Sequence, residues 1–270
     1  MGINVDEIDE DLVNNLLVVN AALLKKAKTG DVNSIKELRN IIRDNVFENH
    51  KIKLDNAYLD IERKKSEPPK SDGSEYKGIP ANMVAPSFSS VLFDIEGKEH
   101  SEYVFPGGRG STKSSFVSLN VIDLLMKNED MHACIFRQVA DTLRSSVYQQ
   151  ILWSISALGL ESEFNCTVSP LEITRVSTGQ KIYFRGADDP GKIKSIKVPF
   201  GYIGVVWLEE LDQFTGEEAV RKIEQSVIRG GDTAFKFKSF NPPKSAQNWA
   251  NKYIKIPRQD RLVIESTYLT

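Results

Sequence analysis

The sequence predicts an α/β protein with a central, mainly parallel sheet flanked by helices, plus an N-terminal helical extension. Two observations favour this class. Candidate strands alternate with helices in most of the chain, and a glycine-rich phosphate-binding pattern joins one strand to the next helix. The 270 residues, 40% of them hydrophobic, suffice for one sizeable core. We expect a helical hairpin over 1–61, a linker over 62–78 and the α/β domain over 79–270.

The N-terminal extension carries two apolar stripes at helical spacing, over 12–24 and 35–42, separated by a Thr-Gly-Asp break at 29–31. Such a hairpin is more commonly a packing arm or an oligomer contact than a catalytic element. The charged stretch that follows contains Pro68-Pro69 and Asp72-Gly73, which are typical of a linker. We therefore place the domain boundary there.

Short apolar runs bounded by turn residues predict the strands of the sheet. Those runs are 91–95, 102–105, 133–137, 204–208, 234–240 and 262–266. The segments 171–176 and 181–185 alternate around a turn and predict an antiparallel hairpin. Apolar residues predict one helix over 116–126, and an apolar residue at every fourth position over 139–155 predicts another that lies on the sheet.

Residues 107–114 fit the P-loop pattern G-x-x-x-x-G-K-[ST] at every fixed position except Thr112, which replaces glycine. In this pattern backbone N–H groups surround phosphate oxygens, the lysine reaches the β- and γ-phosphates, and the hydroxyl binds Mg²⁺. Thr112 weakens the match, because a β-branched residue lacks the conformational freedom of glycine. The strand before the loop and the helix after it favour a nucleotide site. The predicted nucleotide-contacting residues are Gly107, Gly108, Arg109, Gly110, Ser111, Thr112, Lys113, Ser114 and Ser115.

Two adjacent acids, Glu209 and Glu210, follow the apolar strand at 204–208. A buried strand with acids at its tip is the Walker B arrangement. We expect Glu209 to hold the Mg²⁺ shell that Ser114 completes, and Glu210 to orient and polarise the attacking water. An isolated Glu-Glu pair more often marks only the emergence of a strand into solvent. The P-loop upstream reverses that preference.

Asn241 follows the predicted strand at 234–240 and precedes two prolines. Its amide would lie beside the γ-phosphate, where it could donate to phosphate or to the attacking water and report hydrolysis. The alternative is that Asn241-Pro242 only initiates a turn.

Composition excludes several function classes. A formal net charge of −2 excludes a globally basic nucleic-acid binder but allows a local basic stripe, or a ring that holds DNA by topology. The chain has no long apolar run and its N-terminus is acidic, so we expect no membrane segment and a cytosolic protein. Cys134 and Cys166 lack disulfide or zinc spacing, and Cys134 is expected to be buried. The three histidines show no ligand spacing.

Three segments together, 107–115, 207–214 and 239–243, resemble the ATPase domain of the large terminase subunit of tailed bacteriophages, of the PBSX type. The supporting segments 136–148, 186–195 and 225–231 are similar too, so the resemblance covers about 91–270. It implies an ASCE-type P-loop ATPase that uses ATP and Mg²⁺. It also implies a homo-oligomeric ring in the host cytoplasm, on the portal protein of an empty capsid, that drives double-stranded DNA inward with the small terminase subunit. The isolated chain could be monomeric.

The resemblance also bears on single residues. An arginine within the loop is typical of terminases, and Arg109 could contact the γ-phosphate and sense its loss. Catalysis would thus involve Glu210, Lys113, Arg109 and Asn241. A nuclease domain would be expected to follow Thr270. Candidates for a basic residue that acts on the neighbouring subunit's nucleotide are Arg185, Lys192, Lys194, Lys197 and Arg229. Phe105 and Gln138 are candidates for adenine binding.

Two other functions stay open at this point. The domain could be a nucleotide-binding docking module in which Thr112 impairs turnover, or a helicase-like or chaperone-like P-loop ATPase that acts on another polymer. Phosphate release by variants at Glu210 and Lys113 distinguishes an ATPase from a docking module.

Overall fold

The structure is a computed structural model in which residues 76–188, 193 and 196–267 are described. All of these residues lie in one compact unit. The predicted helical hairpin over 1–61 and nearly all of the predicted linker over 62–78 lie outside the described residues. The domain boundaries therefore stay predictions.

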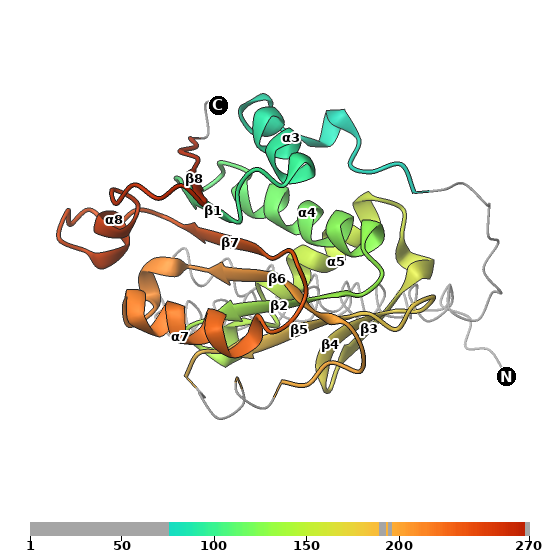
Figure 1. Cartoon of the computed structure of the whole chain (residues 1–270). Coiled ribbons are helices and arrows are strands. Elements are labelled where there is room, and N and C mark those ends of the chain that lie inside the picture. The colour runs from blue at the N-terminus through green and yellow to red at the C-terminus, as the bar shows by residue number, and fades with distance from the viewer. Residues whose placement is uncertain (1–75, 189–192, 194–195, 268–270) are drawn as a thin grey trace, which may run out of the picture. The chain divides into compact units, whose positions relative to one another are not determined.

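Among the described residues, one mixed sheet forms the centre of the molecule (Figure 1). In spatial order its strands are β3 (Phe164–Val168), β4 (Leu171–Arg175), β5 (Lys181–Gly186), β2 (Met131–Arg137), β6 (Tyr202–Glu209), β7 (Phe235–Phe240), β1 (Glu102–Pro106) and β8 (Arg261–Val263). Strands β5, β2, β6, β7, β1 and β8 pair in parallel, whereas β3, β4 and β5 pair antiparallel. This confirms the predicted mainly parallel sheet and the predicted hairpin, which is β4 and β5.

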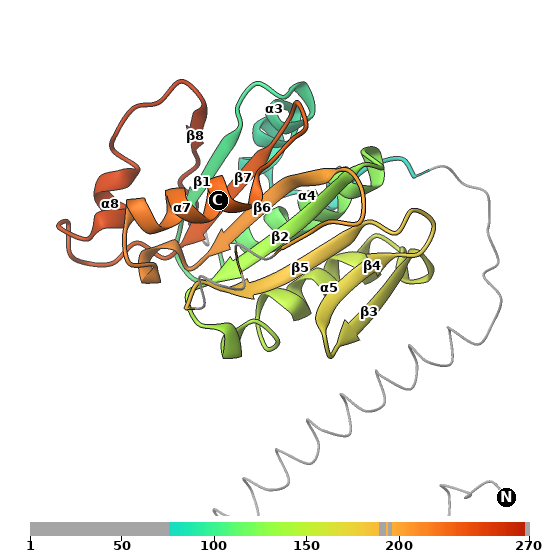
Figure 2. The same cartoon turned by 60° about the horizontal axis from the view of Figure 1, so that its bottom comes forward.

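Helices cover both faces of the sheet (Figure 2). They are α3 (Ser89–Gly97), α4 (Lys113–Lys127), α5 (Val147–Ala157), α7 (Glu217–Val227) and α8 (Trp249–Tyr253), with short 3₁₀ turns at Ala81–Met83, Pro86–Phe88, Ala140–Thr142, Glu161–Glu163 and Leu211–Gln213. Helices α3, α4 and α5 pack on one face and α7 and α8 on the other, so the sheet separates two hydrophobic cores.

Alternation along the central strands fills these two cores. On β6, Val205 and Trp207 pack with α4 and α5, whereas Val206 and Leu208 pack with α7 and α8. Because both faces are covered, the strand is apolar without interruption, as expected for a central parallel strand. Cys134 on β2 is fully buried, as predicted.

Three sequence-based assignments require correction. The segment 91–95 is helix α3 and not a strand. Val91 and Ile95, four residues apart, are buried, while Phe93 between them is 70% exposed, and five residues are too few to distinguish the two periods. The helix predicted over 139–155 begins only at Val147. The strand predicted over 262–266 is Arg261–Val263, followed by an isolated bridge between Gly107 and Ser266.

In the part of the chain that the structure describes, no helix combines the length and apolar character needed to cross a membrane.

A buried histidine fixes the end of the β5–β6 connection. The backbone N–H of Lys181 donates to Nδ1 of His132 at 2.9 Å, and Nε2 lies 2.9 Å from the carbonyl oxygen of Phe200. A backbone N–H can only donate, so Nδ1 accepts and the single ring proton sits on Nε2. Burial lowers the pKa of His132, which favours this neutral form.

The titration of His132 should make the fold sensitive to mild acid. The pKa of His132 in the folded protein lies below its unfolded value of about 6.5. The contribution of neutral His132 to the free energy of unfolding is therefore complete above that pH, and it is lost as the pH falls through the folded pKa. We expect the free energy of unfolding, measured by urea titration, to fall below about pH 6.5 more steeply in the wild type than in His132→Gln. Equal slopes for the two proteins would contradict this assignment.

Candidate active site

Three parallel strands bring the predicted motifs to one edge of the sheet. Strand β1 runs into the loop at 107–112, β6 ends at Glu209, and β7 lies between them and ends just before Asn241. The registers pair Pro106 with Phe240, and Glu209 with Ser239. The carboxyl ends of parallel strands are where open α/β sheets bind ligands.

A cavity of about 220 Å³ lies at this edge, between the loop and the acids. Its lining residues are Arg109, Gly110, Lys113, Ser114, Glu209, Glu210, Ser239, Phe240 and Asn241. The structure thus brings together every residue predicted to be catalytic and both predicted metal ligands. Gly107, Gly108, Ser111, Thr112 and Ser115 belong to the loop or the first turn of α4 and do not line this cavity. The individual roles stay predictions.

Close packing and positive φ angles define the loop. A Cβ on Gly107 would lie 2.8 Å from the backbone oxygen of Ser266 and 2.9 Å from the hydroxyl of Ser111, so only glycine fits there. Gly110 has φ +79°, a conformation that glycine adopts without strain. The loop is therefore held against Ser266, three residues after β8.

Thr112 adopts the left-handed backbone conformation, with φ +56° and ψ 4°. Glycine would take this conformation without the steric cost that a Cβ imposes. The side chain of Thr112 is exposed, and its carbonyl oxygen accepts the N–H of Phe116 at 3.0 Å as α4 begins. Thr112 therefore holds a backbone conformation that is strained for a residue with a Cβ.

The side chain of Lys113 is fixed at both sides of the cavity. Its Nζ donates to the carbonyl oxygen of Gly108 at 3.1 Å and to Oδ1 of Asn241 at 2.8 Å. Burial lowers the pKa of Lys113, and the nearby Glu209 carboxylate partly opposes this effect. This ammonium group already joins the loop to the end of β7.

Arg137, at the end of β2, forms ion pairs with both acids. Its Nε lies 2.8 Å from Oε2 of Glu209, and its Nη2 forms an ion pair with Oε2 of Glu210. Its Nη1 donates to the hydroxyl of Ser146 at 3.0 Å, which fixes the segment before α5. Because Arg137 holds Ser146, the residues between β2 and Val147 do not continue the predicted helix, which begins only at Val147.

Sequence reasoning missed Arg137 as a site residue. Its position at the end of a predicted strand was visible, but which strand neighbours β2 was not. The structure pairs Phe136 with Leu208, so the next residue of each strand, Arg137 and Glu209, is brought to the same edge. An arginine at the tip of a buried strand is the signal that could have identified it.

Burial raises the pKa of Glu209, Arg137 opposes this rise, and Glu210 adds to it. Glu210 has φ +58°, so the chain turns sharply after the strand and both carboxylates reach the cavity side. A carboxylate desolvated in this way is well suited to a cation, because a bound positive charge would favour its ionised form.

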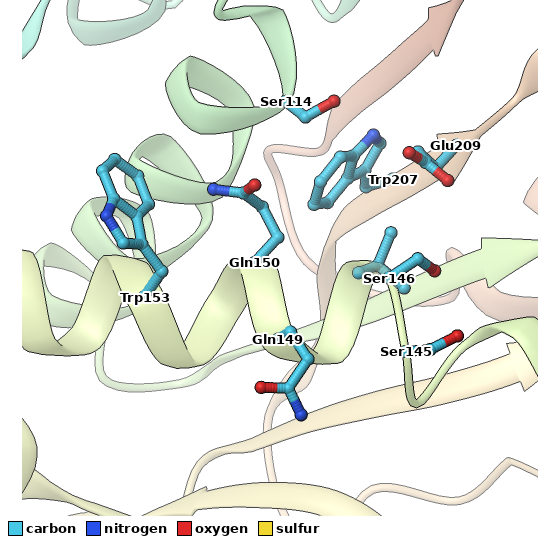
Figure 3. Close-up of a pocket in the computed structure, with 9 residues that line it drawn as sticks. Ser114, Ser145, Ser146, Gln149, Gln150, Trp153, Trp207 and Glu209 are labelled. Carbon is cyan, nitrogen blue, oxygen red and sulfur yellow. The ribbon is translucent and has the colours of Figure 1, made fainter. Parts of the chain in front are cut away.

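A second, larger cavity of about 380 Å³ adjoins the first, and Ser114 and Glu209 line both. Figure 3 shows Gln150 and Trp153 projecting from α5 on one side of it and Glu209 from the end of β6 on the other. The buried Trp207 forms part of the wall, and its Nε1 donates to the hydroxyl of Ser239 at 2.9 Å. The space beside the acids therefore extends towards α5.

The donor set is compatible with Mg²⁺. Ser114 and Glu209 supply oxygen ligands at the shared wall of the two cavities. Among the described residues, no group of three or more His, Cys, Asp or Glu side chains could hold a metal ion. Mg²⁺ commonly needs only one or two protein ligands and completes its shell with phosphate oxygens and water, so these two residues fit the ion.

The two candidates for adenine binding have different outcomes. The prediction of Phe105 as an adenine contact is wrong, because this side chain is fully buried and packs against Phe88, Phe116 and Phe237. The adenine role of Gln138 stays a prediction.

Of the candidates for a trans-acting basic residue, the three that the structure describes, Arg185, Lys197 and Arg229, line neither cavity. Arg185 lies on β5, where its Nη1 donates to the carbonyl oxygen of Phe184 at 2.8 Å. Lys197 and Arg229 are exposed, and Lys192 and Lys194 lie outside the described residues. Their role stays a prediction.

The strand order, with β7 inserted between the P-loop strand β1 and the acidic strand β6, defines an α/β P-loop NTPase fold of the ASCE type. The sequence profile of the family described as phage terminase large subunit matches residues 99–270. The chain therefore belongs to the phage terminase large subunit family.

Individual relatives agree with this family. The chain is 38% identical over 196 residues to the terminase large subunit of Bacillus phage SPP1, which covers 70% of this chain and 46% of that protein. It is 29% identical over 188 residues to the PBSX phage terminase large subunit of Bacillus subtilis strain 168, covering 69% and 41%. The large terminase of the thermophilic bacteriophage D6E has a similar fold, with a TM-score of 0.54, 14% identity, and coverage of 68% and 46%. The chain thus spans less than half the length of these relatives.

Replacing Thr112 by glycine should stabilise the protein. Removing the Cβ relieves about 1 kcal/mol of steric strain at a residue in the left-handed conformation. The greater conformational freedom of glycine in the unfolded chain offsets part of that gain. We expect Thr112→Gly to raise the free energy of unfolding in urea by about 0.5 kcal/mol. Thr112→Ala, which keeps the Cβ, is the control and should give no such gain. A loss of stability in Thr112→Gly would refute this account of the loop.

Removing the arginine from the acid pair should destabilise the fold. We expect Arg137→Gln to lower the free energy of unfolding by about 2 kcal/mol, below the range for fully buried pairs because Glu210 is 40% exposed. Adding Glu209→Gln should recover part of that loss, because one unpaired carboxylate is then removed. A double-mutant cycle measured by urea unfolding checks this, and strictly additive losses would argue against the coupling.

Proposed function

We propose that this chain is the ATPase motor domain of a phage DNA-packaging terminase, and that it hydrolyses ATP to move double-stranded DNA into a procapsid. The observation that carries the proposal is the single cavity lined by Lys113, Ser114, Glu209, Glu210 and Asn241. The family supports the DNA-packaging role. The D6E large terminase, which has a similar fold, has also been solved in complex with ADP.

Binding would begin with Lys113. Nζ of this residue exchanges the carbonyl oxygen of Gly108 and Oδ1 of Asn241 for the β- and γ-phosphate oxygens of ATP. The side-chain amide of Asn241 then loses its lysine partner and can turn towards the γ-phosphate or the attacking water. Arg109 is exposed on the loop and lines the same cavity, so its guanidinium would be a second positive group in contact with the γ-phosphate.

Hydrolysis requires a polarised water in line with the γ-phosphate. Glu210 accepts a hydrogen bond from that water and orients it, and Arg137 holds the carboxylate in place. Glu209 and Ser114 would hold Mg²⁺, which when bound neutralises charge on the β- and γ-phosphates. Loss of the γ-phosphate would leave Asn241 and Arg109 without a phosphate partner, which reports the event to β7 and to the loop.

The proposed partners follow from the family. We expect a homo-oligomeric ring on the portal protein, assisted by the small terminase subunit, in the host cytoplasm. A basic residue from the neighbouring subunit, for which Arg185, Lys192, Lys194, Lys197 and Arg229 are the candidates, would then complete the charge neutralisation of the reacting phosphate. Phosphate release per subunit should rise with protein concentration and on addition of portal protein.

Two variants test the proposed roles. We expect Glu210→Gln to retain ATP affinity but to lower the rate of phosphate release at least about 100-fold, because it removes only the activation of water. Lys113→Ala should weaken both, because it removes a phosphate contact. Binding is measured with a fluorescent ATP analogue, and turnover by phosphate release.

Glu217→Gln is the matched control, because it removes one exposed carboxylate at the start of α7, outside the cavity. It should behave as the wild type. Undiminished hydrolysis in Glu210→Gln excludes the proposed role of this residue. ATP binding without any turnover in the wild type would favour the docking-module alternative.

A further inference from the structure

The segment from Pro242 to Arg261, which contains α8, concentrates positive charge in a chain whose net charge is −2. Its charged residues are Lys244, Lys252, Lys255, Arg258 and Arg261 against the single acid Asp260. Arg261 is buried, and Arg258 forms an ion pair with Asp260 at 2.8 Å. The three lysines, Lys244, Lys252 and Lys255, are exposed, and we call them the α8 lysines.

Among the described residues, the α8 lysines have no acidic partner; the exposed Lys77 and Lys98 have none either, but they lie singly, whereas the α8 lysines lie on one segment. Lys127, Lys181, Lys222, Lys236 and Lys238 each lie within ion-pair distance of a carboxylate. Among the described residues, none of the α8 lysines has such a neighbour. Three solvated ammonium groups on one short segment repel one another. An anionic surface that covers the segment relieves this repulsion and therefore lowers its free energy.

The fold holds this segment rigidly. Nδ2 of Asn251 donates to the carbonyl oxygens of Pro243 at 2.7 Å and Ser245 at 2.9 Å, and Nε1 of Trp249 donates to that of Phe214 at 2.9 Å. The hydroxyl of Tyr253, a buried residue of α8, donates to the buried Glu102 at 2.8 Å. The α8 lysines therefore project from an ordered platform, which reduces the entropy lost on binding.

A buried ionic network extends this anchor into the sheet. Nζ of Lys238, on β7, lies 3.2 Å from Glu102 and 2.8 Å from Glu224 of α7, and donates to the hydroxyl of Tyr253 at 2.6 Å. Arg261 pairs with the same Glu102 at 2.5 Å. Helix α8 is thus connected to β1, β7 and α7 through side chains that cannot easily separate.

The segment also begins next to the nucleotide cavity. Lys244 lies three residues after Asn241, and α8 stands at the edge of the sheet towards which β6 and β7 point (Figure 1). A shift of Asn241 on phosphate loss would therefore be transmitted along the chain to the α8 lysines.

We propose that the α8 lysines form a surface that contacts the phosphate backbone of double-stranded DNA. This inference rests on the proposed function and names one place where the moving polymer is held. Lysine ammonium groups bind phosphate oxygens without reading bases, so the contact is independent of sequence. A motor that must move any sequence requires a contact of this kind.

Binding of labelled duplex DNA of random sequence over a range of salt concentrations tests this proposal. We expect Lys244→Gln/Lys252→Gln/Lys255→Gln to bind at least about tenfold more weakly at low salt. The slope of log affinity against log salt should fall by about 0.9 for each contact removed. Basal phosphate release should be unchanged, while half-maximal DNA stimulation should need more DNA.

The matched control, Lys77→Gln/Lys98→Gln/Lys222→Gln, removes the same charge from exposed residues elsewhere and should bind DNA as the wild type does. An equal loss in both triple variants, unchanged binding in the α8 variant, or no DNA binding by the wild type would each overturn the proposal. Wild-type phosphate release that depends on Glu210 would persist in all these cases. The proposed ATPase activity can therefore stand or fall separately.

Discussion

Backbone hydrogen bonds between β1, β7 and β6 hold the last residues of these three strands side by side, and the rest of the site depends on this constraint. The pairing of Pro106 with Phe240 brings Asn241 to the P-loop, and the pairing of Glu209 with Ser239 brings the acids to the same cavity. Ladder registers in a sheet buried on both faces cannot slip without exposing the core, so the arrangement of the candidate site is as stable as the domain itself.

The charged side chains at this edge of the sheet are distributed between two sets of partners. Two carboxylates, one of them largely buried, lie beside the guanidinium of Arg137, while Lys113 is held by the neutral oxygens of Gly108 and Asn241. The lysine can therefore change partners without leaving a carboxylate unpaired, whereas removing Arg137 would leave both acids without their cation. This division pairs Lys113 with neutral oxygens only and keeps the acids in position.

The second face of the sheet carries a different polar structure. Lys238, Glu102 and Arg261 are almost completely inaccessible to solvent, and each has an oppositely charged partner. Such a network contributes little net stability compared with apolar packing, but it fixes the positions of its members because none can be left unpaired in the interior. Here it ties α8 to β1 and β7, so that the surface outside α8 and the P-loop strand share one anchor.

The sequence by itself determined the class of fold and the chemical groups of the site, because both are encoded locally: apolar runs bounded by turns, a glycine-rich loop, and acids and an amide at strand ends. It predicted a mainly parallel sheet, but it assigned α3 as a strand, since Val91 and Ile95 fit either period in so short a run. It identified Thr112 as the residue that departs from the P-loop pattern. Only the tertiary structure decided that β2 neighbours β6 and that Arg137 therefore meets the two acids. Strand order depends on contacts between segments far apart in the chain, and no local pattern of residues specifies it.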